Sequence, residues 1–191
     1  MKPLRVREDV ERQRERFSAA CQSLRRGYAA TGTCGSVSMR TGDALMITVA
    51  VAGAGDDGPV PPRQGVVLID PVQGLPLLGE TEWPPAETSG HLAIHRRLPD
   101  VGVVIHVPEA SSVAPVADTL VTPLGDVTAE APATLLRYRG GLFVRGRDLG
   151  EARRGLEELE ALARPPSRPL AHPSCSPDGI HETEAVEVIT R

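Results

Sequence analysis

The groups in this sequence best suited to chemistry are a glutamate and three histidines near the middle of the chain. Glu87, His91 and His95 are spaced four residues apart in a segment predicted to be a helix, so their side chains share one helical face. His106 lies near the end of the apolar stretch 101–107, which is predicted to be a buried strand. A carboxylate next to an imidazole can transfer protons near pH 7, and both groups also bind divalent ions. The pattern therefore predicts acid–base chemistry or a metal site built from Glu87, His91 and His106, with a packed core position as the alternative for His91.

The lysine and cysteine content excludes other reaction classes. Lys2 is the only lysine, and it lies in a terminus that we expect to be frayed. Schiff-base aldolases and pyridoxal phosphate enzymes need a lysine amine in a pocket, and the GxxxxGK[ST] phosphate loop also needs a lysine. Cys21, Cys34 and Cys175 form no CxxC pair, so reduced thiols are expected, and Cys34 is expected to pack or to form hydrogen bonds.

The overall composition predicts one globular α/β domain. Its 191 residues are 40% hydrophobic and 24% charged, which is enough to bury a core. Aromatic residues make up only 3% and the net charge is -4, so no nucleic-acid partner is expected. The N-terminus is charged, and no apolar run approaches the roughly 20 residues that span a bilayer. We therefore expect a cytoplasmic protein without a membrane partner.

Hydrophobic periodicity and turn residues predict the order of the elements. Helices are expected over 7–28, from Glu87 to before Pro99, and over 149–163 after an N-cap at Asp148. Strands are expected over 36–40, 44–51, 65–70, 101–107, 134–138 and 142–145, with a short helix or turn over 108–117. The last helix is expected to bury Leu149, Ala152, Leu156, Leu159 and Leu162. The domain is expected to cover 1–163, followed by a Pro-rich tail over 164–191.

Four ordered sequence blocks resemble the class II aldolase and adducin family. The glycine turn Gly32-Thr33-Cys34-Gly35-Ser36-Val37-Ser38-Met39-Arg40 is similar to the GTSGNxSxR of that family and is followed by Leu45-Met46-Ile47-Thr48. The other blocks are Pro84-Pro85-Ala86-Glu87 with His91-Leu92-Ala93-Ile94-His95, then Pro99-Asp100-Val101-Gly102-Val103-Val104-Ile105-His106-Val107-Pro108, and finally Leu136-Arg137-Tyr138-Arg139-Gly140 with Gly146-Arg147-Asp148-Leu149. The resemblance implies a three-layer α/β/α fold with a central, mainly antiparallel β-sheet between helices. It also implies a homo-oligomer, which in this family is usually a tetramer.

The resemblance also implies a site, but most of its metal ligands are replaced. In the family, three histidines hold a divalent ion and a glutamate acts as acid and base. His106 and Glu87 match one ligand and the glutamate, whereas Pro108 and Arg139 stand at the other two ligand positions. A proline offers no ligand and an arginine repels a dication, so no cofactor is expected, with a rebuilt zinc, iron or manganese site as the alternative. The resemblance further implies that Thr33, Ser36, Thr48 and His91 bind substrate.

Two functions remain open at this stage. In the first, Glu87 and His106 move protons while Arg139 grips a carboxylate or stabilises an enolate of a small oxo- or hydroxy-acid. This would be lyase, dehydratase or isomerase chemistry without the three-histidine metal site. In the second, Arg139 only pairs with Glu87, and the chain is a non-catalytic scaffold or ligand-binding member comparable to the adducin head.

Overall fold

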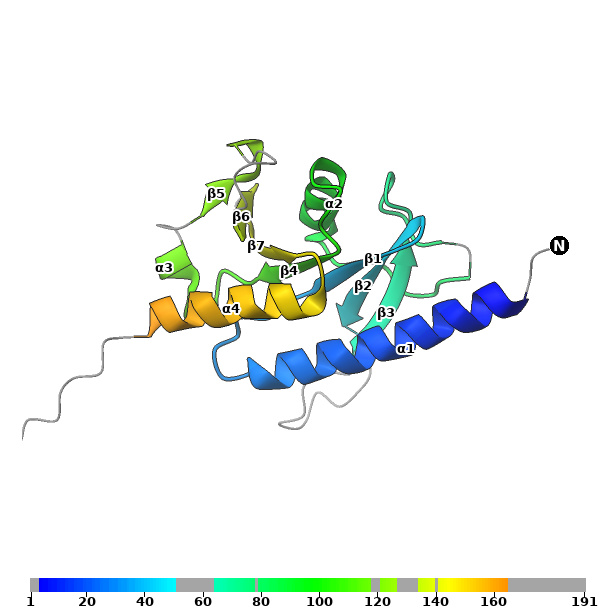
Figure 1. The fold of residues 1–191 in the computed structure, drawn as a ribbon, viewed down its shortest axis with the longest axis horizontal. Coiled ribbons are helices and arrows are strands. Elements are labelled where there is room, and N and C mark those ends of the chain that lie inside the picture. The colour runs from blue at the N-terminus through cyan, green and yellow to red at the C-terminus, as the bar shows by residue number, and fades with distance from the viewer. Residues whose placement is uncertain are drawn as a thin grey trace, which may run out of the picture.

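The protein forms a mixed sheet with helices on both faces, as the computed structural model shows (Figure 1). The structure describes residues 4–50, 64–77, 79–117, 121–126, 134–139 and 141–164. Within them, seven strands have the order β3-β2-β1-β4-β7-β6-β5. The strands are β1 (Val37–Thr41), β2 (Ala44–Ala50), β3 (Gln64–Ile69), β4 (Val103–Val107), β5 (Thr122–Pro123), β6 (Leu135–Tyr138) and β7 (Gly141–Gly146). Only the β5–β6 pair is parallel among these described strands, so the predicted mainly antiparallel sheet is confirmed.

The helices form the two outer layers. Helix α2 (Thr88–Arg97) lies on one face of the sheet, while α1 (Leu4–Gly27) and α4 (Leu149–Ala163) lie on the other (Figure 1). The short α3 (Ala114–Ala117) follows β4, and a single 3-10 turn, η1 (Leu124–Asp126), follows β5. The α/β/α layering expected from the sequence is therefore confirmed.

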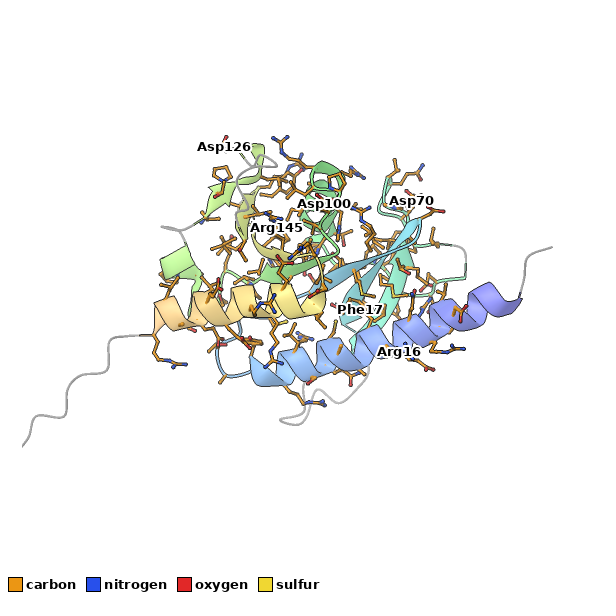
Figure 2. The ribbon with its side chains drawn as sticks, in the orientation of Figure 1. Arg16, Phe17, Asp70, Asp100, Asp126 and Arg145 are labelled. Atoms are coloured by element: carbon orange, nitrogen blue, oxygen red, sulfur yellow. The ribbon has the colours of Figure 1, made fainter. Side chains whose placement is uncertain are left out.

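Helix α1 packs against the sheet through its apolar face. Phe17, Cys21 and Leu24 recur at helical spacing and are all buried against the sheet. Phe17 lies on the sheet side of the helix, whereas Arg16 lies on the opposite side (Figure 2). Glu80 reaches this helix from the loop after β3 and accepts hydrogen bonds from Arg14, which also donates to the Val66 carbonyl at 3.0 Å.

The hairpin β1–β2 forms where the sequence predicts it. Its turn passes through Gly42, whose φ of 53° lies in the left-handed region that glycine adopts most easily. Beyond this hairpin, β1 also pairs with β4, so β4 lies between β1 and β7 in the middle of the sheet. This central strand carries His106.

The predicted start of α4 is confirmed, but one part of its buried face is wrong. Asp148 caps the helix by accepting a hydrogen bond from the Glu151 amide at 2.8 Å. Ala152, Leu156 and Leu159 are buried as expected, whereas Leu162 is 59% exposed. Three residues advance a helix by about 300°, so Leu162 is turned roughly 60° away from Leu159. Ala163 packs against the core instead.

Some sequence predictions fall outside the described residues. These include Cys175, the segment 165–191 and the connections 51–63 and 127–133. The boundary between domain and tail stays a prediction. Among the helices that the structure describes, none is both long and apolar enough to cross a bilayer.

Candidate active site

The structure brings Glu87 and His106 together at one end of the sheet. Glu87 is the N-cap residue of α2, and its side chain makes no capping hydrogen bond. Its Oε1 lies 3.6 Å from Nδ1 of His106, which projects from β4. This distance is longer than a hydrogen bond. The two side chains are 27% and 18% exposed, respectively, so the pair is half-buried but reachable from solvent.

The surroundings of His106 favour a neutral imidazole. Burial lowers the pKa of His106, while the nearby carboxylates of Glu87 and Glu109 oppose this shift. The ring packs on Phe143, its cross-strand neighbour, with 5.2 Å between the ring centroids. His106 is therefore held in place and can either accept or release a proton near pH 7.

Gly35 allows the chain to pass close to His106. Its amide donates a hydrogen bond to the His106 carbonyl at 2.8 Å. A Cβ atom at this position would lie 2.9 Å from that carbonyl oxygen and 3.0 Å from Nδ1 of the imidazole. The glycine turn therefore fixes where the imidazole can lie.

We expect Gly35→Ala to displace His106 and to lower the free energy of unfolding by about 1–3 kcal/mol, because the added methyl group overpacks the turn. Urea unfolding measures the stability, and the imidazole NMR signals of His106 report the displacement. Gly27→Ala is the matched control, since a Cβ there meets nothing within 4 Å. Unchanged stability and an unchanged His106 spectrum in Gly35→Ala would contradict this account of the turn.

Two serines and two histidines form a buried polar cluster beside this pair. Ser36 Oγ lies 2.9 Å from Nε2 of His91, and Ser38 Oγ lies 2.8 Å from Nδ1 of the same ring. Ser38 Oγ also lies 2.9 Å from Nε2 of His95, whose Nδ1 lies 3.2 Å from the Val101 carbonyl oxygen. His91 is 0% exposed. Both ring nitrogens of His91 face serine hydroxyls, which disfavours direct substrate binding by His91 and a rebuilt metal site of Glu87, His91 and His106; both stay predictions.

The buried imidazoles should make stability depend on acid. Burial lowers the pKa of His95 to about 4 and lowers that of His91 well below its ordinary value. In the unfolded chain both rings titrate near 6.5, so the unfolded state binds more protons between these values. The stability from neutral His95 is thus fully present above about pH 6.5 and is lost as the pH falls toward 4.

We expect the free energy of unfolding to be lower at pH 5 than at pH 7 by about 2 kcal/mol from His95 alone. Urea unfolding at the two pH values measures the difference. An NMR titration separates the histidine contribution from that of carboxylates, because the His95 ring should stay neutral throughout. A His95 ring that titrates near 6.5 in the folded protein would refute the prediction.

Other predicted substrate-binding residues are buried and bonded within the chain. The Thr33 hydroxyl is 0% exposed and donates to Glu160 of α4 at 2.9 Å, and Thr31 donates to the same carboxylate. Thr48 is 1% exposed, and its Oγ1 accepts a hydrogen bond from the Val37 amide at 2.9 Å. Both hydroxyls position the glycine turn and the first strand, and the substrate-binding roles expected for Thr33 and Thr48 stay predictions.

Cys34 does not have the character of a nucleophile. It is buried, and burial raises the pKa of its thiol to about 12. A thiol with this pKa is protonated at neutral pH and reacts poorly. The packing role expected for this residue fits its position.

Arg139 lies at the same end of the sheet as His106 but does not touch it. The residue follows β6 with φ 48° and is exposed, and its guanidinium lies over the Tyr138 ring, 5.3 Å from the centroid. Tyr138 pairs with Gly141, and Phe143 pairs with His106, so Arg139 lies two strands away from that histidine. Glu87 contacts His106 rather than Arg139, which disagrees with a simple Glu87–Arg139 ion pair.

The described residues do not fit a family-type divalent ion. Of the three ligand positions that the motif resemblance implies, only that of His106 offers a donor, because Pro108 has none and Arg139 is a permanent cation. Across the described ranges, no group of three or more His, Cys, Asp or Glu side chains could hold an ion. The absence of a metal at this position stays a prediction.

The sequence reasoning missed three residues that shape the site. Ser38 bridges the two buried histidines, Phe143 packs on His91 and His106, and Glu160 holds the threonines of the turn. The alternation within 36–40 places Ser36 and Ser38 on one face of the strand, which was the available signal for Ser38. Phe143 and Glu160 are joined to the site only by long-range packing.

Comparisons with known proteins are consistent with this architecture. The sequence profile of the Class II Aldolase and Adducin N-terminal domain matches residues 15–130. YgbL from Escherichia coli, named with aldolase, epimerase and decarboxylase as candidate activities, is 21% identical with a TM-score of 0.53 over 80% of this chain and 86% of its own. The corresponding YgbL from Klebsiella pneumoniae is 21% identical with a TM-score of 0.54, over 80% and 87%. L-fuculose-1-phosphate aldolase from Thermus thermophilus is 21% identical with a TM-score of 0.51, over 78% and 92%. None of the curated protein sequences compared with the chain matches it.

Proposed function

The chain belongs to the class II aldolase and adducin family, and from this premise we propose that it is an enzyme that forms an enolate from a small oxo- or hydroxy-acid. The reaction class is that of a lyase, dehydratase or isomerase. The observation that carries the proposal is the 3.6 Å approach of the Glu87 carboxylate to the His106 imidazole in a half-buried place. Both groups can take part in proton transfer, and the Glu87 side chain makes no capping hydrogen bond to α2.

Glu87 is the base in this proposal. Its carboxylate takes the proton from the carbon next to the substrate carbonyl, the C–H electron pair becomes the new carbon–carbon double bond, and the carbonyl electron pair moves onto oxygen. The neutral His106 ring carries one N–H, which stabilises the enolate oxygen or returns a proton to the product. The lowered pKa of His106 supports this role, because the neutral ring is the major form at pH 7.

Arg139 supplies the positive charge in this proposal. Adjacent strands lie about 4.8 Å apart, so the backbones of Arg139 and His106 are on the order of 10 Å apart across two strands. An arginine side chain spans much of that distance and can bind a carboxylate through two hydrogen bonds. In this proposal the exposed guanidinium on Tyr138 binds the carboxylate of an acid whose other end reaches Glu87, which its exposure and position support. The charge on Arg139 would also help to stabilise the enolate, with no step assigned to a metal.

The test measures loss of a substrate C–H in heavy water. Purified protein is incubated with a panel of small 2-oxo and 2-hydroxy acids, and proton NMR follows exchange of the hydrogen next to the carbonyl carbon. We expect catalysed exchange for at least one acid, with the same rate after treatment with a chelator. Exchange that disappears with the chelator and returns with zinc, iron or manganese would reject the metal-independent reaction.

A second function is favoured by the replacement of two ligand positions by Pro108 and Arg139. The chain would then be a non-catalytic family member that binds a small acid or serves as a scaffold. A melting temperature raised by an acid without any exchange would favour ligand binding. A homo-oligomer, with four copies by family resemblance, is part of both proposals, and light scattering of the purified protein measures it.

A further inference from the structure

Helix α2 begins without the usual side-chain cap. An N-cap residue normally has an extended backbone, and its side chain accepts a hydrogen bond from one of the first helical amides. Glu87, the N-cap residue of α2, instead has a φ of -74° and a ψ of 0°, and its side chain makes no capping hydrogen bond. Another group therefore has to hold the start of this helix.

Thr88, the first residue of α2, bonds back to the turn that precedes the helix. Its amide donates a hydrogen bond to the Pro85 carbonyl at 3.0 Å, and its hydroxyl donates to the same oxygen at 2.5 Å. The Glu87 carbonyl in turn accepts hydrogen bonds from the amides of Gly90 at 2.9 Å and His91 at 3.4 Å. The backbone of Glu87 is therefore held on both sides, without using its carboxylate as a cap.

Packing favours this direction of the Thr88 hydroxyl. In a helix, threonine divides between two rotamers, because its hydroxyl can bond a carbonyl three or four residues back. Thr88 is 7% exposed, and a Cβ atom at Gly74 would lie 3.8 Å from its methyl carbon, so the turn after β3 packs near the methyl group. The turn itself is held, because the Gly74 amide donates to the Asp70 carbonyl at 2.8 Å and Arg96 of α2 donates to the Pro71 carbonyl at 3.0 Å.

We propose that Thr88 is a positioning residue for Glu87. By bonding to Pro85, Thr88 takes the place of the side-chain cap and leaves the Glu87 carboxylate to face Nδ1 of His106, 3.6 Å away. Without the hydroxyl, the carboxylate turns toward the first amides of α2, because the positive end of the helix dipole attracts an anion. Thr88 itself touches no substrate. The inference rests on the proposed function, in which Glu87 is the base.

The rate of C–H exchange tests the effect of Thr88 on the reaction. Thr88→Val keeps the shape of the side chain and removes the hydroxyl. We expect it to lower the maximal exchange rate by about tenfold to a hundredfold, because a small displacement of a reacting group is costly. The dissociation constant of the acid should stay within a few-fold, and Thr88→Ser should restore most of the rate. An unchanged rate in Thr88→Val, or no rescue by Thr88→Ser, would overturn the proposal.

Thr41→Val is the matched control. The Thr41 hydroxyl, at the hairpin end of β1, donates a hydrogen bond to the Gln13 side chain at 2.6 Å. The substitution therefore makes the same chemical change and also removes one hydrogen bond. It should leave the exchange rate unaltered, and the urea midpoints show how much stability each variant loses. An equal loss of rate in Thr41→Val and Thr88→Val would mean that reduced stability, and not the position of Glu87, slows the reaction.

The position of the Glu87 carboxylate can be measured without any substrate. Crystal structures of the full-length protein and its variants give the distance between Oε1 of Glu87 and Nδ1 of His106. We expect the 3.6 Å approach to be kept in Thr88→Ser and lost in Thr88→Val, where the carboxylate turns toward the first amides of α2. Thr88→Ala also removes the hydroxyl and provides the same test if the valine variant does not fold. A carboxylate that still faces His106 without the Thr88 hydroxyl would overturn the proposal.

The two proposals fail separately. If no acid undergoes C–H exchange but the carboxylate turns away in Thr88→Val, enolate chemistry is rejected and Thr88 remains the residue that positions Glu87. If exchange is found and Thr88→Val changes neither the rate nor the carboxylate, the catalytic proposal stands and the role of Thr88 is rejected.

Discussion

Glu87→Gln is expected to slow C–H exchange in the substrate acid by a factor of about 10²–10⁴, because the amide keeps the shape of the side chain but cannot take a proton. The fold should not change, since the Glu87 side chain makes no capping hydrogen bond to α2. The measurement compares exchange rates of the variant and the unmodified protein at saturating acid, with the urea midpoint as the check on folding. Binding of the acid should remain within a few-fold, so the loss should appear in the maximal rate.

Glu158→Gln is the matched control for this variant. Glu158 is exposed on α4, on the opposite face of the sheet from α2. Its substitution makes the same change in net charge and should leave the exchange rate unaltered. Equal rates for Glu87→Gln and the control would show that Glu87 is not the base, and the role would pass to His106 or to a group outside the described residues.

The sequence predicts the fold well because local signals agree with one another along the chain. The glycine turn at Gly42, the N-cap Asp148 and the apolar strand that carries His106 each specify an element by short-range physics. The error at Leu162 is also local in origin. The prediction extends the spacing from Leu156 to Leu159 by a further three residues, and this second step turns Leu162 away from the core.

The candidate site is less predictable because it depends on pairings across the sheet. The sequence places Glu87 and His91 on one helical face, but only the tertiary structure separates their roles. Glu87 at the helix start faces His106, whereas His91 is one turn deeper and is held by Ser36 and Ser38. A sequence motif shows which residue types are present, whereas the burial of each side chain in the tertiary structure determines whether it is accessible to a ligand.

The motif resemblance indicates which family positions Pro108 and Arg139 occupy, but it does not indicate what these two residues do there. The motif resemblance, and not the family match over residues 15–130, is what aligns Pro108 and Arg139 with ligand positions, and neither side chain can bind a divalent ion. What this chain has instead is a cation on an aromatic ring at the hairpin after β6. In the proposed function this cation provides the positive charge at that end of the sheet.

Phe143→Ala is expected to lower the free energy of unfolding by about 3–5 kcal/mol, because Phe143 is a large side chain with 2% exposure and its removal leaves a cavity. The ring fills the space between β7 and α2, where a Cβ at Gly90 would lie only 2.2 Å from it. It also packs on both His91 and His106, at centroid distances of 5.4 and 5.2 Å. The substitution should therefore disturb the candidate site as well as the hydrophobic core.

Phe17→Ala separates these two effects, because Phe17 is a similarly buried aromatic that α1 packs onto the other face of the sheet. Both variants should lose comparable stability in urea unfolding. Only Phe143→Ala should admit water to the His106 ring, and since burial is what lowers the pKa of His106, that pKa should rise toward its ordinary value. An NMR titration of His106 in the two variants measures the difference. If the pKa of His106 moved equally in both, the packing of Phe143 would not be what sets the protonation state of the site.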